Sequence, residues 1–262
     1  MQYFGLHDLR GIAITSLSSY DTMTVSDIPL VSDSAFSPSQ SMPASRISLY
    51  EFGGSEDTIR RIQKPFVEFF RNSAPVLDIG CGRGTFLQLL SDAGIEACGI
   101  DHSEEALAAC RQKGFSVRQQ DAKSYLSAEP GRFGGIFCSH VIEHMSYEDA
   151  LAFIDLCYRA LRPGGLLLLV TPNPEDICIM SDIFWLDPTH VRPYPKLLLQ
   201  AMMESAGFRM LLARQFLGSW RLVGSRRNLP GFLLRRLLLG RHFGRPNLLV
   251  LGQTQSGPGT VS

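Results

Sequence analysis

Histidine and carboxylate side chains gather in one short segment of the chain. Glu143 and His144 lie three and four residues after His140, which places all three on one face if the segment turns helically. Imidazole nitrogens and carboxylate oxygens together suit a divalent cation. His190, in the polar segment 187–193, is a further candidate. We therefore predict a metal site formed by Glu143, His144, His190 and His140.

The same residues permit two other interpretations. The order H-x-x-E-H in residues 140–144 also occurs in inverted zinc peptidases, where the glutamate is the general base. That motif belongs on a long helix, whereas here it follows residues 135–138, an apolar run typical of a buried strand. In the other interpretation one or more histidines only pack or cap, and for His140 this alternative stays open.

A second candidate site is the sequence V-L-D-I-G-C-G-R-G at residues 76–84. Gly80 and Gly82 allow a sharp turn and let a ligand touch main-chain atoms. A dinucleotide-binding G-x-G-x-x-G loop would need glycine or alanine at position 85, but Thr85 stands there. The carboxylate of Asp78 would repel a pyrophosphate and attract the cationic amino group of a methionine moiety.

Two more carboxylates follow the next apolar runs. Asp101 closes the second predicted strand, and its separation from Asp78 along the chain suits one strand–helix–strand crossover. Such a crossover would place the carboxylate of Asp101 where the ribose hydroxyls of a nucleoside would lie. Asp121 follows the third and could accept a hydrogen bond from an exocyclic adenine amine. An aspartate after a strand is usually a helix cap. In this order behind a glycine loop, the three acids instead indicate a nucleoside site.

The elements that must position these residues alternate along the chain. Predicted strands cover residues 75–79, 96–100, 116–119, 135–138, 166–171, 208–212 and 248–251. Predicted helices cover residues 85–93, 103–112, 122–126, 147–161 and 195–206. Strands and helices in this rhythm give right-handed crossovers and a buried, mostly parallel sheet. The sequence therefore predicts an α/β fold of the doubly wound class, with helices on both faces.

The segment from about residue 50 to 208 resembles class I S-adenosylmethionine (SAM)-dependent methyltransferases. The likeness is carried by residues 76–84, 99–101 (G-I-D), 120–122 (Q-D-A) and 161–165 (L-R-P-G-G). It implies a Rossmann-like, seven-stranded sheet with a reversed final hairpin. It also implies that SAM is the cofactor and is bound by Asp78, Gly80, Asp101 and Asp121. We expect Gly82 to contribute through its backbone.

Two narrower resemblances concern the methyl acceptor. The pattern V-I-E-H at residues 141–144, with a later T-P-N and a lone histidine, is similar to metal-dependent O-methyltransferases of small RNAs and ubiquinone precursors, in which a glutamate often stands at the position of His140. Residues 52–55, 59–63 and 184–193 are similar to methyltransferases of bacterial surface-polysaccharide (O-antigen-type) pathways. The second likeness favours a saccharide hydroxyl, or a glycan phosphate, as acceptor. An RNA ribose or a quinone-type small molecule is the alternative, and a non-catalytic SAM-binding module is another.

Methyl transfer from a sulfonium needs a positioned and deprotonated acceptor. A cation held by Glu143, His144 and His190 would lower the pKa of an acceptor hydroxyl. Without a cation, His144 or His190 would be the general base. These three residues are the predicted catalytic residues.

Composition limits the partners. The chain of 262 residues has a formal net charge of zero. The sequence shows no stripe of aromatic and basic residues of the kind that binds nucleic acid, so we expect no nucleic-acid partner. The six cysteines form no C-x-x-C pair, which favours free thiols and a cytoplasmic protein. Residues 1–45 are predicted to be a flexible tail, and residues 46–262 the methyltransferase domain.

The C-terminal part of the chain is locally basic. Residues 211–262 contain no aspartate or glutamate but many arginines. We interpret residues 216–245 as a basic amphipathic insertion before the last strand. Two interpretations of this insertion stay open. In the one that we favour, it is a surface helix whose leucines pack on the sheet and whose arginines are solvated. In the other, it contacts a lipid-linked glycan or an anionic membrane face, which would place the protein at the inner side of the membrane.

Overall fold

The structure is a computed structural model, and it describes residues 55–216, 237–238, 242 and 244–256. The tail predicted for residues 1–45 and most of the insertion predicted for residues 216–245 lie outside these described residues. Among the described residues, no helix is long and apolar enough to cross a membrane.

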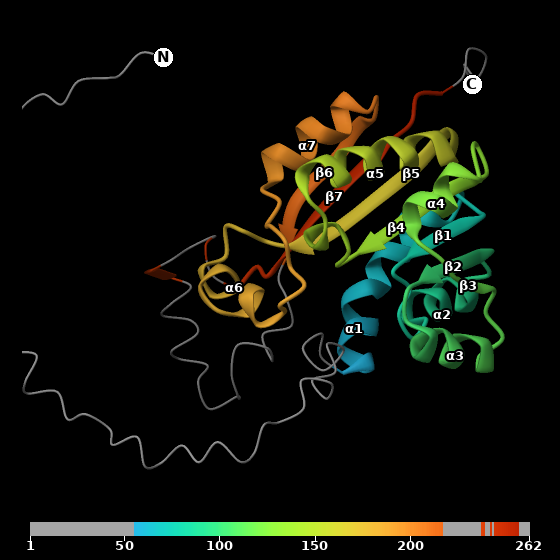
Figure 1. Ribbon diagram of the computed structural model, residues 1–262, viewed down its shortest axis with the longest axis horizontal. Helices are drawn as coiled ribbons and strands as arrows, with labels where there is room; N and C mark the ends of the chain where they lie inside the picture. The colour runs from blue at the N-terminus through green and yellow to red at the C-terminus, as the bar shows by residue number, and fades with distance from the viewer. Residues whose placement is uncertain (1–54, 217–236, 239–241, 243, 257–262) are drawn as a thin grey trace, which may run out of the picture. The chain divides into compact units, whose positions relative to one another are not determined.

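A seven-stranded sheet in the order β3-β2-β1-β4-β5-β7-β6 is the centre of the fold (Figure 1). Its strands are β1 (Val76–Ile79), β2 (Ala97–Asp101), β3 (Val117–Gln119), β4 (Phe133–Ser139), β5 (Leu161–Pro172), β6 (Arg209–Phe216) and β7 (Asn247–Gln253). β7 runs antiparallel to both of its neighbours, while the first five strands are parallel. The predicted doubly wound, mostly parallel sheet with a reversed final hairpin is confirmed.

Helices cover both faces of the sheet (Figure 1). They are α1 (Glu56–Gln63), α2 (Thr85–Asp92), α3 (Glu104–Gln112), α4 (Ala122–Ser127), α5 (Tyr147–Ala160), α6 (Ile177–Ser181) and α7 (Lys196–Ser205), with the 3-10 helices η5 (Lys64–Phe70), η6 (Ile142–His144) and η7 (Ile183–Leu186). Ser103, Asp121 and Ser146 cap α3, α4 and α5 by accepting hydrogen bonds from backbone N–H groups.

The side chains of the central strands divide between two cores. Leu167 and Leu169 of β5 pack with α4, α5 and α7, whereas Leu168 and Val170 pack with η5 and α2 on the other face. This alternation follows from the two-residue repeat of a strand. Because both faces are covered, β5 carries a continuous apolar run.

Two predicted strand boundaries, the start of β5 and the end of β6, differ most from the structure. β5 was expected to begin at residue 166, but it begins at Leu161, which pairs with Phe133 ahead of a register shift in β4. The preceding helix therefore ends at Ala160. β6 extends to Phe216 because it pairs with β7 along the whole length of that strand. Glycine and proline in residues 161–165 conceal the start of β5 in the sequence, and polar residues conceal the end of β6.

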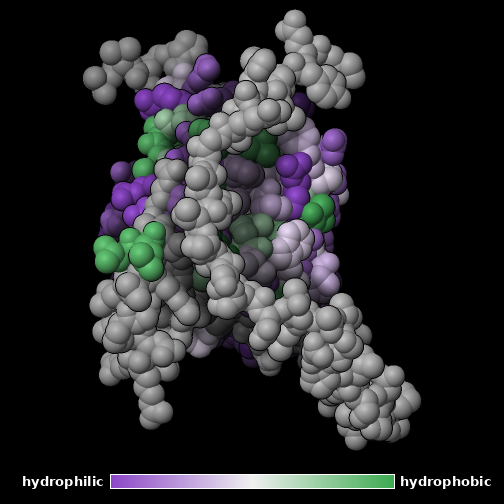
Figure 2. All heavy atoms as spheres, turned by 90° about the vertical axis from the view of Figure 1, so that its left-hand side faces the viewer, coloured by the Kyte–Doolittle hydropathy of each residue, from purple (hydrophilic) through white to green (hydrophobic). Residues whose placement is uncertain are grey.

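The carboxyl ends of β1, β2, β4 and β5 lie at one edge of the sheet, because these strands are parallel. Ligands bind at this edge in open α/β sheets. Figure 2 faces this edge and shows mixed hydrophilic and hydrophobic side chains around a recess. The turn η6 and the segment 187–193 follow β4 and β5, so the histidines and the glycine loop share this edge.

Candidate active site

The glycine loop lies between β1 and α2 and is held against β2. The backbone N–H groups of Gly80 and Cys81 both donate to the carbonyl of Ile100, at 2.9 and 3.1 Å. Gly80 and Gly82 have φ angles of +70° and +53°, a backbone conformation that side chains disfavour. A Cβ atom at Gly80 would lie 2.5 Å from Cγ2 of Val141. The loop that begins at Gly80 thus touches the segment that carries the histidines.

Asp78 is a buried carboxylate at the end of β1. Its side chain is 2% exposed, and its Oδ2 has no hydrogen-bond partner within the described part of the chain. Burial and then the charge of Asp101 raise the pKa of Asp78 to about 8. A buried carboxylate oxygen without a donor fits an arriving ammonium group, such as that of SAM. The residues present therefore suit this cofactor.

Asp101 and Asp121 take part in the backbone structure of the same edge. Asp101 accepts hydrogen bonds from the N–H groups of Gly82 and Ser103, each at 2.8 Å. It therefore fixes the glycine loop to the end of β2. Asp121 caps α4 by accepting from the N–H of Ser124 at 2.9 Å. Their contacts to ribose and adenine remain predictions.

His140 leaves the end of β4 in a left-handed conformation. Its N–H still donates to Val170 at 2.9 Å, but its φ is +57°, rare for any residue except glycine. The chain then forms the short turn η6 rather than a long helix. This geometry excludes the helix that the inverted-peptidase motif requires. The Nδ1 atom of His140 lies 3.1 Å from Oε1 of Glu143.

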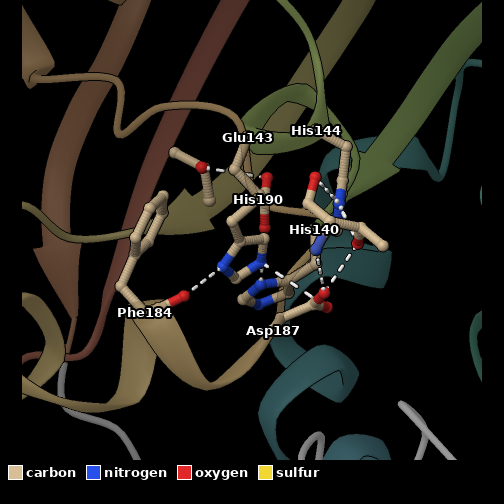
Figure 3. Close-up of polar contacts among 8 residues, drawn as sticks. His140, Glu143, His144, Phe184, Asp187 and His190 are labelled. Carbon is tan, nitrogen blue, oxygen red and sulfur yellow. Dashed lines mark hydrogen bonds and ion pairs between the residues drawn. The ribbon is translucent and has the colours of Figure 1, made fainter. Parts of the chain in front are cut away.

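Hydrogen bonds hold residues 191–194, which follow η7, against η6 and the residues just after it. The N–H groups of Val191 and Arg192 donate to the carbonyl of Glu143 at 2.8 and 3.2 Å. The hydroxyl of Tyr194 donates toward the carbonyls of Met145 and Ser146 at 3.0 and 2.8 Å. These contacts bring His190 beside His144, with ring centroids 4.7 Å apart (Figure 3).

The hydrogen bonds of the two rings decide which nitrogen of each carries a proton. The Nδ1 of His190 lies 2.6 Å from the carbonyl of Phe184, which can only accept, so Nδ1 is the protonated atom. The hydroxyl of Thr189 donates to Asp187 at 2.6 Å, so it accepts from Nδ1 of His144 at 2.9 Å. Both rings, in their neutral forms, then present Nε2 with a free lone pair.

Glu143, His144 and His190 form a candidate metal-binding group. One ligand atom from each lies within 4.8 Å of the other two. Two neutral imidazoles and a carboxylate, with hydrogen bonds fixing the rings, are a donor set that divalent transition metals accept. His140 does not belong to this group, and our prediction of it as a ligand is revised. It instead contacts the carboxylate of Glu143 (Figure 3).

Glu143 is fully buried and is held in its charged form. Burial raises its pKa, but the hydrogen bond and charge of His140 outweigh burial and lower the pKa below its usual value. The hydroxyl of Thr171, at the end of β5, donates to Oε2 of Glu143 at 3.1 Å. The carboxylate is therefore ionised and oriented from two sides, as a metal ligand must be.

Three contributors to this site were missed in the sequence. Thr171 orients Glu143, Thr189 orients His144, and the carbonyl of Phe184 orients His190. A threonine at the end of an apolar strand was the only signal for Thr171. The other two contacts depend on how the segment 183–190 folds, which periodicity does not reveal.

Comparison with known proteins identifies the family. The family described as "Methyltransferase domain" matches residues 55–213. The chain belongs to this family. A crystal structure of a SAM-dependent methyltransferase from Archaeoglobus fulgidus has a TM-score of 0.68 and 27% identity, covering 78% of this chain and 96% of that one. A SAM-dependent methyltransferase from Mesorhizobium loti, at 18% identity and a TM-score of 0.52, covers 77% of this chain and 99% of its own, and supports the fold alone.

Curated relatives match a shorter segment. A ubiquinone biosynthesis O-methyltransferase from Methylococcus capsulatus is 35% identical over 103 residues, which are 37% of this chain and 43% of that protein. The corresponding enzyme of Pseudomonas aeruginosa PAO1 is 36% identical over 104 residues, with similar coverage. This chain thus spans less than half the length of these relatives. The predicted enzyme class, a SAM-dependent methyltransferase, is confirmed by the family and by the Archaeoglobus structure.

Proposed function

We propose that this methyltransferase transfers the methyl group of SAM to a hydroxyl oxygen, with Glu143, His144 and His190 holding a divalent cation next to the acceptor. The observation that supports this most strongly is the convergence of these three side chains within 4.8 Å, in a segment that touches the glycine loop through Val141. SAM brings an electrophilic methyl group on a good leaving group, and a bound cation would lower the pKa of the acceptor hydroxyl. The metal and its site are our inference from the donor set.

The chain's own residues have separate tasks in this proposal. Asp78 receives the amino group of the cofactor, and Gly80 lets the backbone approach it. Glu143 stays ionised beside the acceptor because His140 and Thr171 hold its two oxygens. The Nε2 atoms of His144 and His190 carry the lone pairs that would bind the cation. In its absence, either can take the hydroxyl proton.

The acceptor class is proposed from the relatives of this chain. We propose the hydroxyl of a quinone-type small molecule, because the curated relatives described above are named as ubiquinone biosynthesis O-methyltransferases. The saccharide acceptor, first favoured by the likeness of residues 52–55, 59–63 and 184–193 to polysaccharide methyltransferases, has no support from those relatives. It remains the alternative to be tested in parallel.

Transfer of a tritiated methyl group from SAM tests the proposal. The full chain is incubated with a catechol or with a methyl glycoside, with and without EDTA. We expect label in the catechol, loss of transfer in EDTA and recovery on adding excess Mg²⁺ or Mn²⁺. Glu143→Gln should nearly abolish transfer while SAM still binds, whereas Glu148→Gln, an exposed acid on α5, should not change it.

Each adverse result removes a defined part of the proposal. Full activity in EDTA would refute the metal role. Label only in the glycoside would replace the acceptor class. No labelling of any hydroxyl acceptor, with SAM bound, would refute O-methyl transfer.

A further inference from the structure

Part of the C-terminal region 211–262, which contains no aspartate or glutamate, lines a cavity. The cavity has a volume of about 450 Å³ and lies where β6 ends and the chain approaches β7. Its lining residues are Glu175, Lys196, Ala213, Arg214, Gln215, Phe216 and Arg245. A volume of this size suits a small ligand or one end of a larger one.

Positive charge predominates in this cavity. Lys196, Arg214 and Arg245 face a single acid, Glu175. Among the described residues, none of the three cationic side chains forms an ion pair. The nearby carboxylate of Asp176 is occupied by backbone N–H groups, including that of Arg245 at 2.7 Å. The cavity therefore has an excess of donors and positive charge for an anion.

The backbone connects this cavity to the candidate active site. Thr171, which holds Glu143, is followed on the same chain by Asn173, whose side chain donates to the carbonyl of Arg245 at 2.8 Å. Across the sheet, Pro172 pairs with Asn247 and Asn247 pairs with Phe216. The end of β6 is thus two strands from the end of β5. At 4.7–4.9 Å per strand, this separation is roughly 10 Å.

We propose that the cavity binds an oxyanion of the methyl acceptor, a phosphate ester or a carboxylate, while the acceptor hydroxyl lies at Glu143, His144 and His190. The guanidinium groups of Arg214 and Arg245 offer paired N–H donors that match either oxyanion. The acceptor class is then a hydroxylated molecule that also carries an anionic group, set apart from the methylated oxygen. The assignment to an acceptor depends on the proposed function, whereas anion binding by the cavity does not.

Calorimetric titration of the full chain tests the anion site, with pyrophosphate as a phosphate probe and benzoate as a carboxylate probe. We expect at least one probe to bind at low ionic strength and to bind more weakly as salt is added. Arg214→Gln and Arg245→Gln should each weaken binding about tenfold. Neither substitution touches the backbone contacts of Arg245, so both variants should fold and bind SAM normally.

Arg159→Gln is the matched control. Arg159 lies on α5 and is exposed, and its side chain forms a surface ion pair with Asp155, so its replacement should leave probe binding unchanged. If Arg214→Gln and Arg245→Gln lose only pyrophosphate binding, the anionic group of the acceptor is a phosphate ester. If they lose only benzoate binding, it is a carboxylate. No binding of either probe, or equal weakening by all three variants, overturns the anion site.

Methyl transfer separates this inference from the proposed function. If the protein transfers no methyl group to any hydroxyl but both arginines still control probe binding, the proposed function and the acceptor assignment fail while the anion site stands. If transfer occurs and the probes do not bind, the anion site fails alone.

Discussion

The side chain of Val141 occupies the space that a Cβ atom on Gly80 would need, with its Cγ2 2.5 Å from that position. This contact joins the glycine loop after β1 to the segment after β4. The first carries the residues expected to bind the cofactor, and the second leads into Glu143 and His144. A change at Gly80 therefore acts on both halves of the site.

Gly80→Ala should weaken SAM binding by at least about tenfold. The new Cβ must displace Val141, and the positive φ of Gly80 adds about 1 kcal/mol of strain. Gly94→Ala is the control, because Gly94 has the same φ of +70° but no atom lies within 4 Å of the position that a Cβ would take there. It should lose similar stability and keep its SAM affinity. Calorimetry and thermal unfolding of both variants measure the difference, and equal SAM affinities would disprove the close-packing argument.

The ionisation of Asp78 should make the stability of the SAM-free protein depend on pH. Burial, with a smaller contribution from Asp101, raises its pKa from 3.8 to about 8. Between these values the folded chain keeps a proton that the unfolded chain has released, so the free energy of unfolding falls as pH rises through this window. Asp78→Asn should remove that decline, and Asp92→Asn, at a surface ion pair with Arg60, should retain it.

SAM affinity should change in the opposite direction. Because the ammonium group of SAM needs the ionised carboxylate of Asp78, affinity should rise with pH up to about 8 in the wild-type chain. Asp78→Asn should bind SAM weakly and without this rise. Urea unfolding and SAM titration from pH 5 to 9 test both effects. An identical pH profile in wild type and Asp78→Asn would show that the carboxylate is not the titrating group.

Thr171→Val should impair the site without removing any predicted ligand. The substitution leaves Oε2 of the buried Glu143 without the hydroxyl donor at 3.1 Å, at a cost of about 1–3 kcal/mol in stability. Loss of such an orienting contact should lower metal affinity by about 10–100-fold. Thr171→Ser keeps the hydroxyl and should restore metal affinity. Failure of serine to do so would mean that packing, not the hydrogen bond, is what Thr171 provides.

Strand and helix periodicity predicted the doubly wound α/β sheet, whereas the reversed final hairpin was expected from the resemblance to class I methyltransferases. Leu167 to Val170 form an apolar run bounded by glycines and a proline, and such runs mark strands covered on both faces. The order of Asp78, Asp101 and Asp121 along the chain also indicated that their strands end at one edge. These predictions succeed because each depends on local sequence and on the fixed handedness of strand–helix–strand units.

The geometry within the metal-binding group was less accessible. His140 was predicted as a ligand from helical spacing, but its positive φ turns the chain before η6 begins. Spacing rules apply only to continuous helices. The pairing of His144 with His190 depends on backbone hydrogen bonds to the carbonyl of Glu143 between segments far apart in the chain. No periodic pattern encodes such contacts.

Manganese binding to the full chain tests the central claim most directly. Electron paramagnetic resonance measures free Mn²⁺ during titration of the wild-type protein, the Glu143→Gln variant and the Glu148→Gln control, each with bound S-adenosylhomocysteine. We predict one bound Mn²⁺ per chain in wild type and Glu148→Gln, and its loss in Glu143→Gln. Equal Mn²⁺ binding by all three proteins, or none by the wild type, would contradict the account.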